Sequence, residues 1–248
     1  MSNASSSEIR HEFAKSKIGL IGIGILLSLV ILSIVAAVTI PIETFKQWNN
    51  PGNWISYPKT SAPAWVNYFM TEKIPEHLIL DNPTTITKED VISLTSHQFA
   101  VQYHYDDFPS DFIYEFSIEY SGSQLLQISV IRPDQSQILL LSRSLPQSDT
   151  IIMHHERIFS TDDSIKKNIQ IHFSELEFYN QSISSEDMIF ANMDGDVLKG
   201  DYIFLANIYG IEEKAKIIDS KLILGGKAYG IMGTDELRRD LAVGLLWG

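Results

Sequence analysis

The sequence of 248 residues contains no cysteine. Disulfide bonds, thiolate metal sites and a cysteine nucleophile are therefore excluded. Basic residues are also scarce, because 19 Lys and Arg stand against 31 Asp and Glu, which gives a net charge of -12. Phosphate backbones are bound by basic surfaces, so this balance argues against nucleic acid as a partner. The acidity is typical of a well-solvated protein surface.

Motifs of common catalytic and metal sites are absent as well. The sequence has no G-x-S-x-G, H-E-x-x-H or G-x-x-x-x-G-K-[ST] segment. The adjacent His154 and His155 would point to opposite faces of a strand, which is unsuited to a shared metal ion. The acidic stretches "DDFPSD" and "MDGDVLKGD" lack calcium-loop spacing, and Asp194-Gly195 is typical of a tight turn. The sequence therefore predicts no catalytic residue, no metal site and no enzyme.

One long apolar run stands out, from Ile18 to Ile40, without a charged residue. At ~1.5 Å per residue, a helix of this length crosses a hydrocarbon core of ~30 Å. A cleaved signal peptide is the alternative, although its apolar region is usually only ~7–15 residues long. Arg10, Lys15 and Lys17 precede the run. The positive-inside rule therefore predicts a cell-membrane protein with a cytoplasmic N-terminus and an extracytoplasmic chain after about residue 41.

The remaining chain reads as mainly β. Residues 41–83 are rich in Trp, Pro, Asn and Tyr, and one short helix is predicted there from Pro63 to about Lys73. The aromatic residues of this stretch fit either the membrane interface or the edge of a domain core. Beyond it, alternating segments separated by turn signals predict the short strands of a sandwich or barrel. These segments are 97–105, 111–120, 124–133, 136–145, 166–176, 200–210 and 214–226, and helical patches are predicted at 87–94 and 184–193.

The last segment, "GTDELRRDLAVGLLWG", has the pattern of an amphipathic helix. Thr234 is suited to cap its first turn, where the helix dipole favours the acidic residues that follow. An apolar stripe recurs every four residues at Leu237, Leu241 and Leu245. Such a helix fits the membrane surface or a place on the β domain.

The same segment resembles the GTD-x-x-G-R-D segment of the dipeptide/oligopeptide ABC-transporter permeases, in their C-type subunit. The stretch "EFAKSKIGLIGIGILL" is similar to the basic start and first membrane helix of that family. One departure is Arg238, which stands where the family usually has glycine. The matching positions are Gly233, Thr234, Asp235, Leu237, Arg239, Asp240 and Gly248.

The resemblance implies a membrane subunit of a peptide-type ABC importer. The implied partners are a second permease subunit, ATPase subunits, a substrate-binding protein and membrane lipid. ATP is bound by the ATPase subunits in such systems, so no cofactor is expected in this chain. The resemblance covers only the two ends, and the β-rich stretch between them reads as an inserted domain near the docking side of the binding protein. The family's transport core is expected to lie outside this chain.

Two other functions stay open. One is a single-pass, membrane-anchored extracellular β domain that binds a ligand or carbohydrate, and the other is an anchored hydrolase, for which no nucleophile is evident. The predicted fold class is an N-terminal transmembrane helix plus a mainly-β, sandwich-like extracytoplasmic domain that ends in an amphipathic interfacial helix. The predicted divisions are a cytoplasmic N-terminus (1–17), a transmembrane helix (18–40), a Trp/Pro-rich juxtamembrane segment (41–83), a β-rich domain (84–229) and the GTD-motif helix (230–248).

Overall fold

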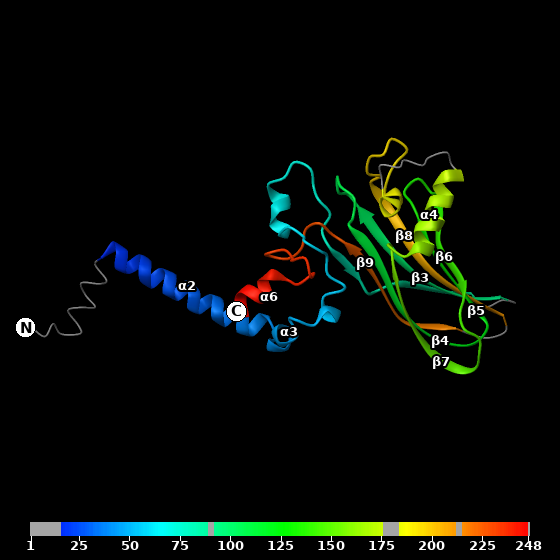
Figure 1. Cartoon of the computed structure of the whole chain (residues 1–248), viewed down its shortest axis with the longest axis horizontal. Helices are drawn as coiled ribbons and strands as arrows, with labels where there is room; N and C mark the ends of the chain where they lie inside the picture. The colour runs from blue at the N-terminus through cyan, green and yellow to red at the C-terminus, as the bar shows by residue number, and fades with distance from the viewer. Residues whose placement is uncertain (1–15, 89–91, 176–183, 212–214, 248) are drawn as a thin grey trace, which may run out of the picture.

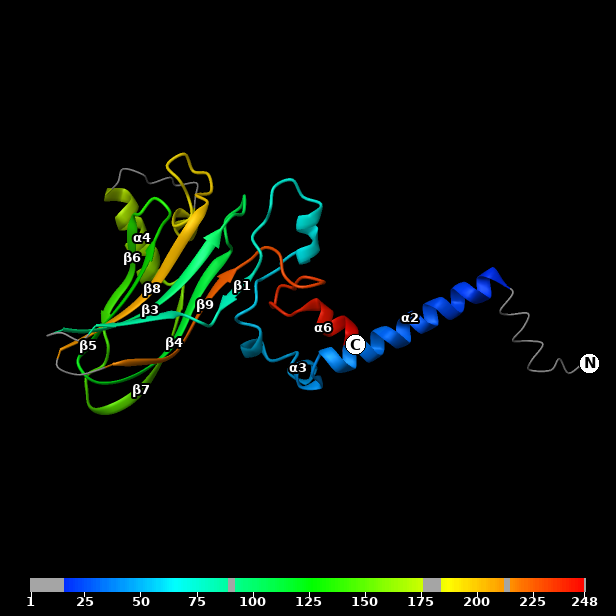
Figure 2. The same cartoon turned by 180° about the vertical axis from the view of Figure 1, so that it is seen from behind.

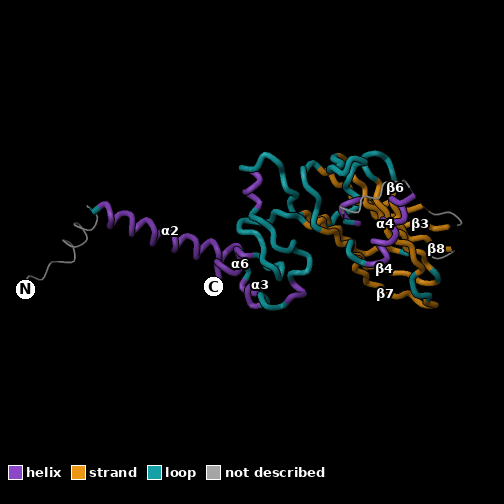
Figure 3. Tube along the Cα trace, turned by 45° about the horizontal axis from the view of Figure 1, so that its top comes forward, coloured by secondary structure: helices purple, strands orange, loops and turns teal. Residues whose placement is uncertain are grey.

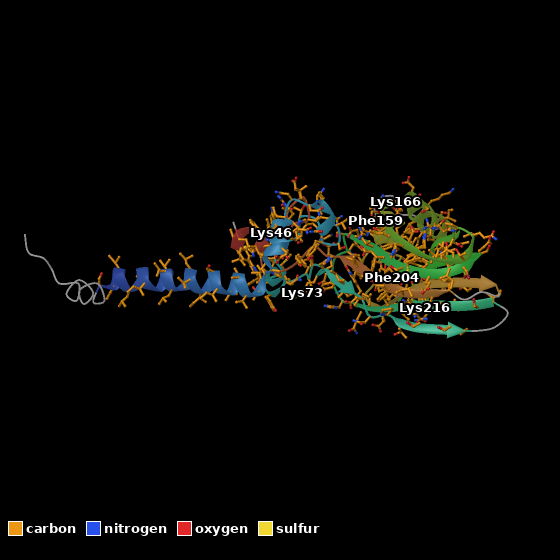
Figure 4. All side chains as sticks on the ribbon, turned by 90° about the horizontal axis from the view of Figure 1, so that it is seen from below. Lys46, Lys73, Phe159, Lys166, Phe204 and Lys216 are labelled. Carbon is orange, nitrogen blue, oxygen red and sulfur yellow. The ribbon has the colours of Figure 1, made fainter. Side chains whose placement is uncertain are left out.

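The computed structural model describes residues 16–88, 92–175, 184–211 and 215–247. Its first element is the long helix α2 (Lys17–Thr39), which extends away from the rest of the molecule (Figure 1). Ser16 caps it, because its hydroxyl accepts a hydrogen bond from the N–H of Gly19 at 3.3 Å. Apolar side chains project from α2 in all directions (Figure 4). Among the described residues it is the one helix long and apolar enough to cross a membrane, and it overlaps the predicted 18–40 span.

Two antiparallel sheets form the half of the molecule that is farther from α2, and they confirm the mainly-β prediction (Figure 1). The five-stranded sheet has the order β2 (Thr84–Lys88), β3 (Ile92–Tyr103), β8 (Gly200–Ile211), β5 (Gln124–Ile131), β6 (Gln137–Ser144). The four-stranded sheet has the order β1 (Leu78–Leu80), β9 (Lys216–Gly225), β4 (Asp111–Gly122), β7 (Ser148–Phe159). Alternation of apolar and polar residues gives each sheet one apolar face, and the two faces pack together as a sandwich. The sandwich includes β1, which precedes the predicted domain start at residue 84.

The core of the sandwich is aromatic and aliphatic. Phe204 of β8 lies between Phe112 of β4 and Phe190, with ring centroids 5.9 and 6.4 Å away. Burial of one such side chain stabilises the fold by roughly 1.5–3 kcal/mol. Alternate residues of the central strands fill the space between the sheets: Tyr114, Phe116, Ile118 and Tyr120 from β4, Leu126, Ile128 and Val130 from β5, and Tyr202, Ala206 and Ile208 from β8.

One predicted strand is a helix. Residues 166–176 alternate in polarity, but the chain there forms α4 (Asp163–Glu175), which packs against β6. Ile165, Ile169 and Phe173 are fully buried, and their spacing of four residues makes a helical stripe. Ile171, which completed the apparent alternation, is exposed. The short α5 (Ser185–Met188) follows, within the predicted 184–193 patch.

Two further predictions differ from the structure. The described part of 87–94, predicted to be helical, belongs to strands β2 and β3, because pairing with β8 outweighs the weak local helical pattern. Strand β7 lies outside the predicted segments. It is the edge strand beside β4, and because nearly all of its residues are exposed or only partly buried, its sequence has no clear apolar face. The turn at Asp194-Gly195 is confirmed, and Gly195 there has a φ of +90°.

Between α2 and the sandwich lies a third region, which we call the base (residues 41–77 and 226–247). It consists mostly of loops, in contrast to the sandwich (Figure 3). Its short helices are α3 (Ile42–Lys46), η1 (Pro51–Asn53), η2 (Ala64–Tyr68) and α6 (Leu241–Trp247). The helix predicted from Pro63 is therefore only the 3-10 turn η2. Two views of the fold show the outgoing and returning chain side by side here, with α6 next to the end of α2 (Figures 1 and 2).

Candidate functional site

The GTD motif forms a tight turn (residues 233–240, the GTD turn) that docks on residues 57–62 of the base. Thr234 is buried with 3% of its surface exposed. Its hydroxyl donates to the carbonyl of Pro58 at 2.7 Å and accepts from the N–H of Ser61 at 3.0 Å. The Thr234 N–H in turn donates to the Ser61 carbonyl at 3.2 Å. These bonds join two segments that are more than 170 residues apart in sequence.

Gly233 fits this position for two reasons. Its φ is +75°, a conformation that favours glycine. A Cβ atom there would also overlap the carbonyl oxygen of Ser61. The first residue of the motif therefore lets the returning chain approach the outgoing chain closely.

Asp235 closes the turn through its carboxylate. One oxygen accepts from the N–H groups of Leu237 and Arg239, both at 2.9 Å. The other oxygen accepts from the Nε of Arg239 at 2.7 Å, and the Arg239 guanidinium lies 4.8 Å from the centre of the Trp48 ring. Burial raises the pKa of Asp235, but the hydrogen bonds from Arg239 outweigh this effect and lower the pKa overall.

Arg238 occupies the position where the permease family usually has glycine. Its φ is +65°, so the backbone here is in the left-handed region that glycine prefers. The side chain donates to the Tyr57 carbonyl at 2.7 Å and pairs with Asp111 at 3.1 Å. Asp111 begins β4, so Arg238 links the GTD turn to the sandwich. These contacts with Tyr57 and Asp111, both outside the turn, accommodate a side chain far larger than that of glycine.

The predicted helix from Thr234 is wrong over residues 234–240. Thr234 uses its hydroxyl to hold residues 58–61 rather than to cap a helix, and the left-handed Arg238 interrupts any helical run. The helix α6 starts after Asp240, whose carboxylate accepts from the N–H of Ala242 at 2.8 Å. Burial raises the pKa of Asp240. Within α6, Gly244 packs so closely against the Trp48 ring that a Cβ would clash with it.

Aromatic rings fill the space behind the turn. Tyr57 lies 5.2 Å from Trp54 and 5.4 Å from Tyr229, between ring centroids. The imidazole of His77 stacks on Tyr57 and meets the Tyr229 ring edge-on at 5.5 Å. Burial lowers the pKa of His77 to about 4. His77 is therefore neutral at physiological pH and behaves as a packing residue.

A separate polar groove of about 300 Å³ crosses the outer face of β4, β7 and β9. Arg157 pairs with Glu115 at 2.7 Å, and Ser117 is 2.8 Å from His155. Asp219 and Lys221 of β9 complete its polar lining. Both signs of charge and several hydrogen-bonding groups thus line one recess. Among the described residues, no three His, Asp or Glu side chains converge as a metal site.

Six of the seven motif positions named from the sequence lie in the described chain, and Gly248 lies outside it. Gly233, Thr234, Asp235, Arg239 and Asp240 come together in the GTD turn and the start of α6. Leu237 is exposed at the tip of the turn rather than on a helical stripe. The sequence alone does not identify the partners Pro58, Ser61 and Asp111. Their role is to bond to residues far along the chain, and no local sequence pattern marks such residues.

Comparisons with known proteins identify no family. No family model matches the sequence, and no curated protein matches it. Solved structures that share some of the fold include the carbohydrate-binding module TmCBM61 in complex with beta-1,4-galactotriose, at 7% identity and a TM-score of 0.26, covering 60% of this chain and 79% of that one. A non-crystalline cellulose specific module, CBM28, has 8% identity, a TM-score of 0.24 and coverages of 70% and 97%. Latent PorU from Porphyromonas gingivalis has 10% identity, a TM-score of 0.33 and coverages of 68% and 14%. Likenesses this weak carry no argument about function.

Proposed function

We propose that the chain is a membrane subunit of a peptide-type ABC importer, in which the sandwich is an extracytoplasmic domain inserted after the first membrane helix. The observation that carries the proposal is the closure of the base. Residues 57–62 and 228–240 are hydrogen-bonded to each other, and α6 contacts both α2 and α3. A domain inserted between two membrane segments needs its entry and exit side by side at the membrane, and the base provides this arrangement.

The backbone of the GTD turn supports the same proposal. The family segment has glycine at its first and sixth positions, which correspond to Gly233 and Arg238. Both residues have positive φ angles, of +75° and +65°. A turn with two left-handed positions explains why glycine suits both places in such a segment.

Co-purification from native membranes tests the proposal. The affinity-tagged full chain, extracted in mild detergent from the cells that produce it, should bring down the second permease subunit and the substrate-binding protein, the partners expected to contact this part of the importer. The matched control is a Gly233→Val variant, which should lose this association while the sandwich stays folded, because its side chain would overlap the Ser61 carbonyl. Recovery of the unmodified chain without a permease subunit and without a substrate-binding protein would refute the importer.

The polar groove favours a second candidate function, a single-pass anchored domain that binds an extracellular polar ligand such as a carbohydrate. Sugar hydroxyls are bound by planar polar groups of the type that Glu115 and Arg157 present. Calorimetric titration of the full chain in micelles with a set of soluble oligosaccharides tests this function. Binding should be abolished in Arg157→Ala and kept in Lys166→Ala, since Lys166 pairs with Glu186 outside the groove. No heat with any sugar would remove the carbohydrate version of this candidate.

A further inference from the structure

The face of the base next to α2 is apolar. Tyr68 and Phe69, at the tip of η2, are 86% and 84% exposed, and Ile231 in the following loop is 71% exposed. Met232, Leu241 and Leu245 continue this surface toward α6. We call these six residues the apolar rim. Such large exposed apolar groups gathered on one face mark a contact surface.

A hollow of about 460 Å³ opens within this surface. It is lined by Met232, Leu241, Gly244 and Leu245 together with the rings of Phe45 and Trp48. Its lining is apolar throughout. Phe45 belongs to α3, which follows the end of α2 directly, so the hollow begins where the long apolar helix ends.

The rim is built as a fixed surface rather than a loose loop. The indole N–H of Trp65 in η2 donates to the carbonyl of Ile231 at 2.9 Å, which ties the two projecting loops together. Trp65 also meets Phe69 edge-on at 6.3 Å. Lys73 donates to the carbonyls of Asn67 and Met70 and so holds the chain just after η2. The exposed rings are therefore presented in a set position.

The position of the rim identifies its occupant. Two views from opposite sides show η2 (cyan) and the C-terminal segment (red) on the side of the base that faces α2 (Figures 1 and 2). A spanning helix runs within a few tens of degrees of the membrane normal, so the side of the base that faces α2 meets the plane in which α2 leaves the hydrocarbon core. Trp and Tyr side chains with apolar neighbours are favoured at that depth, where their polar tips reach the headgroups.

We propose that the apolar rim lies in the lipid headgroup and acyl boundary of the bilayer that holds α2, and that the hollow accepts part of a lipid acyl chain. The inference rests on the membrane anchoring in the proposed function, and it goes beyond it. The sandwich is then held at a fixed tilt by two contacts, the spanning helix and the rim. An apolar surface of this kind enters the interface by about 5–10 Å.

Single cysteines with an environment-sensitive fluorophore test this inference, and the cysteine-free chain makes such labelling specific. The full chain carrying Tyr68→Cys or Ile231→Cys is reconstituted in phosphatidylcholine vesicles with nitroxide lipids, the nitroxide being placed either at the headgroup boundary or deep in the acyl region. Leu29→Cys in α2 reports insertion of the helix. Ile151→Cys in β7 is the matched control, because it is an equally exposed apolar residue on the sandwich, far from α2.

The expected result is a blue-shifted emission at positions 68 and 231, with stronger quenching by the shallow nitroxide than by the deep one. Position 29 should be quenched mainly by the deep nitroxide, and position 151 by neither. A quenched position 29 with unquenched positions 68 and 231 would overturn the inference alone and indicate that a protein partner covers the rim. An unquenched position 29 would overturn the anchoring itself.

Discussion

The sandwich and the base are held together by different forces. The sandwich has an apolar core in which whole aromatic rings are buried between two sheets. The base has few buried aliphatic groups, and its two passing segments are joined by hydrogen bonds around Thr234, Asp235 and Arg238. The stability that comes from buried apolar area changes little when side chains of similar volume are exchanged. A hydrogen-bonded turn, by contrast, loses stability when a single donor or acceptor atom is removed. The base should therefore be the part whose stability responds to small chemical changes.

The distribution of tryptophan allows the two regions to be observed separately. All four tryptophans, Trp48, Trp54, Trp65 and Trp247, belong to the base. Indole emission therefore reports on the base, and far-ultraviolet circular dichroism at the β band reports mainly on the sandwich. Each unfolding prediction below uses both probes on the full chain in detergent micelles.

The largest effect is expected from Phe204→Ala. Phe204 is fully buried between the sheets, so its loss leaves a cavity that should lower the free energy of unfolding of the sandwich by about 3–5 kcal/mol. Circular dichroism during urea unfolding measures this change. The indole transition should shift less, and if both transitions shift together by the full amount, the two regions form one cooperative unit and the comparison fails.

Acid should weaken the base through His77. His77 has a pKa of about 4 in the fold and near 6.5 when unfolded. Between these values the unfolded chain binds more protons, so the stability of the base is complete above pH 6.5 and falls as the pH drops toward 4. The loss reaches up to about 3 kcal/mol, at 1.36 kcal/mol per pKa unit. Urea unfolding followed by indole emission across this pH range measures it.

A matched variant isolates the histidine. His77→Phe keeps an aromatic ring against Tyr57 and Tyr229 but removes the titrating group, so the decline between pH 6.5 and 4 should disappear. Asp235 acts in a lower range, because its lowered pKa puts its loss of stability below its ordinary value of 3.8. A decline that persists unchanged in His77→Phe would assign the effect to another group.

Thr234→Val should have an intermediate effect that is confined to the base. The two side chains have nearly the same shape, so the change removes the hydroxyl that bonds to Pro58 and Ser61 and adds no cavity. A loss of about 2 kcal/mol is expected in the indole transition, from two hydrogen bonds at about 1 kcal/mol each. Thr234→Ser keeps the hydroxyl and should retain most of the stability. An equal loss in both variants would mean that the methyl group of Thr234 contributes as much as its hydroxyl, which contradicts a role carried mainly by the hydrogen bonds.

The same contrast explains what the sequence could predict. Most strands of the sandwich are predicted by the alternation of apolar and polar residues, because every second side chain of a strand faces the core and is apolar. Two elements are exceptions. The alternation of Ile169, Ile171 and Phe173 predicts a strand where the chain forms α4, and β7 has no alternating pattern because little of it faces the core.

The base is less predictable for a physical reason. Thr234, Asp235 and Arg239 carry local signals of a helix start, and in a chain without distant partners they favour one. The bonds from Thr234 to Pro58 and Ser61 cross more than 170 residues, and no local pattern encodes them. The motif positions were therefore found by resemblance, while their structural role required the fold.

The smallest net change is expected where the chain departs from the resembled family. A non-glycine residue in the left-handed region costs about 1–2 kcal/mol, and Arg238 offsets this cost through its half-buried contacts with Tyr57 and Asp111. Arg238→Gly removes both the strain and the contacts, so the stability measured from the indole transition should stay within about 0.5 kcal/mol of that of the unmodified chain.

Arg238→Ala keeps the strain and loses the contacts. It should be about 1 kcal/mol less stable than Arg238→Gly, which is the usual preference for glycine at left-handed positions. Urea unfolding of these two variants decides whether the left-handed backbone at position 238 favours glycine, although the residue there is arginine. If Arg238→Ala is as stable as Arg238→Gly, the left-handed backbone plays no part, and the correspondence with the family glycine loses its physical basis.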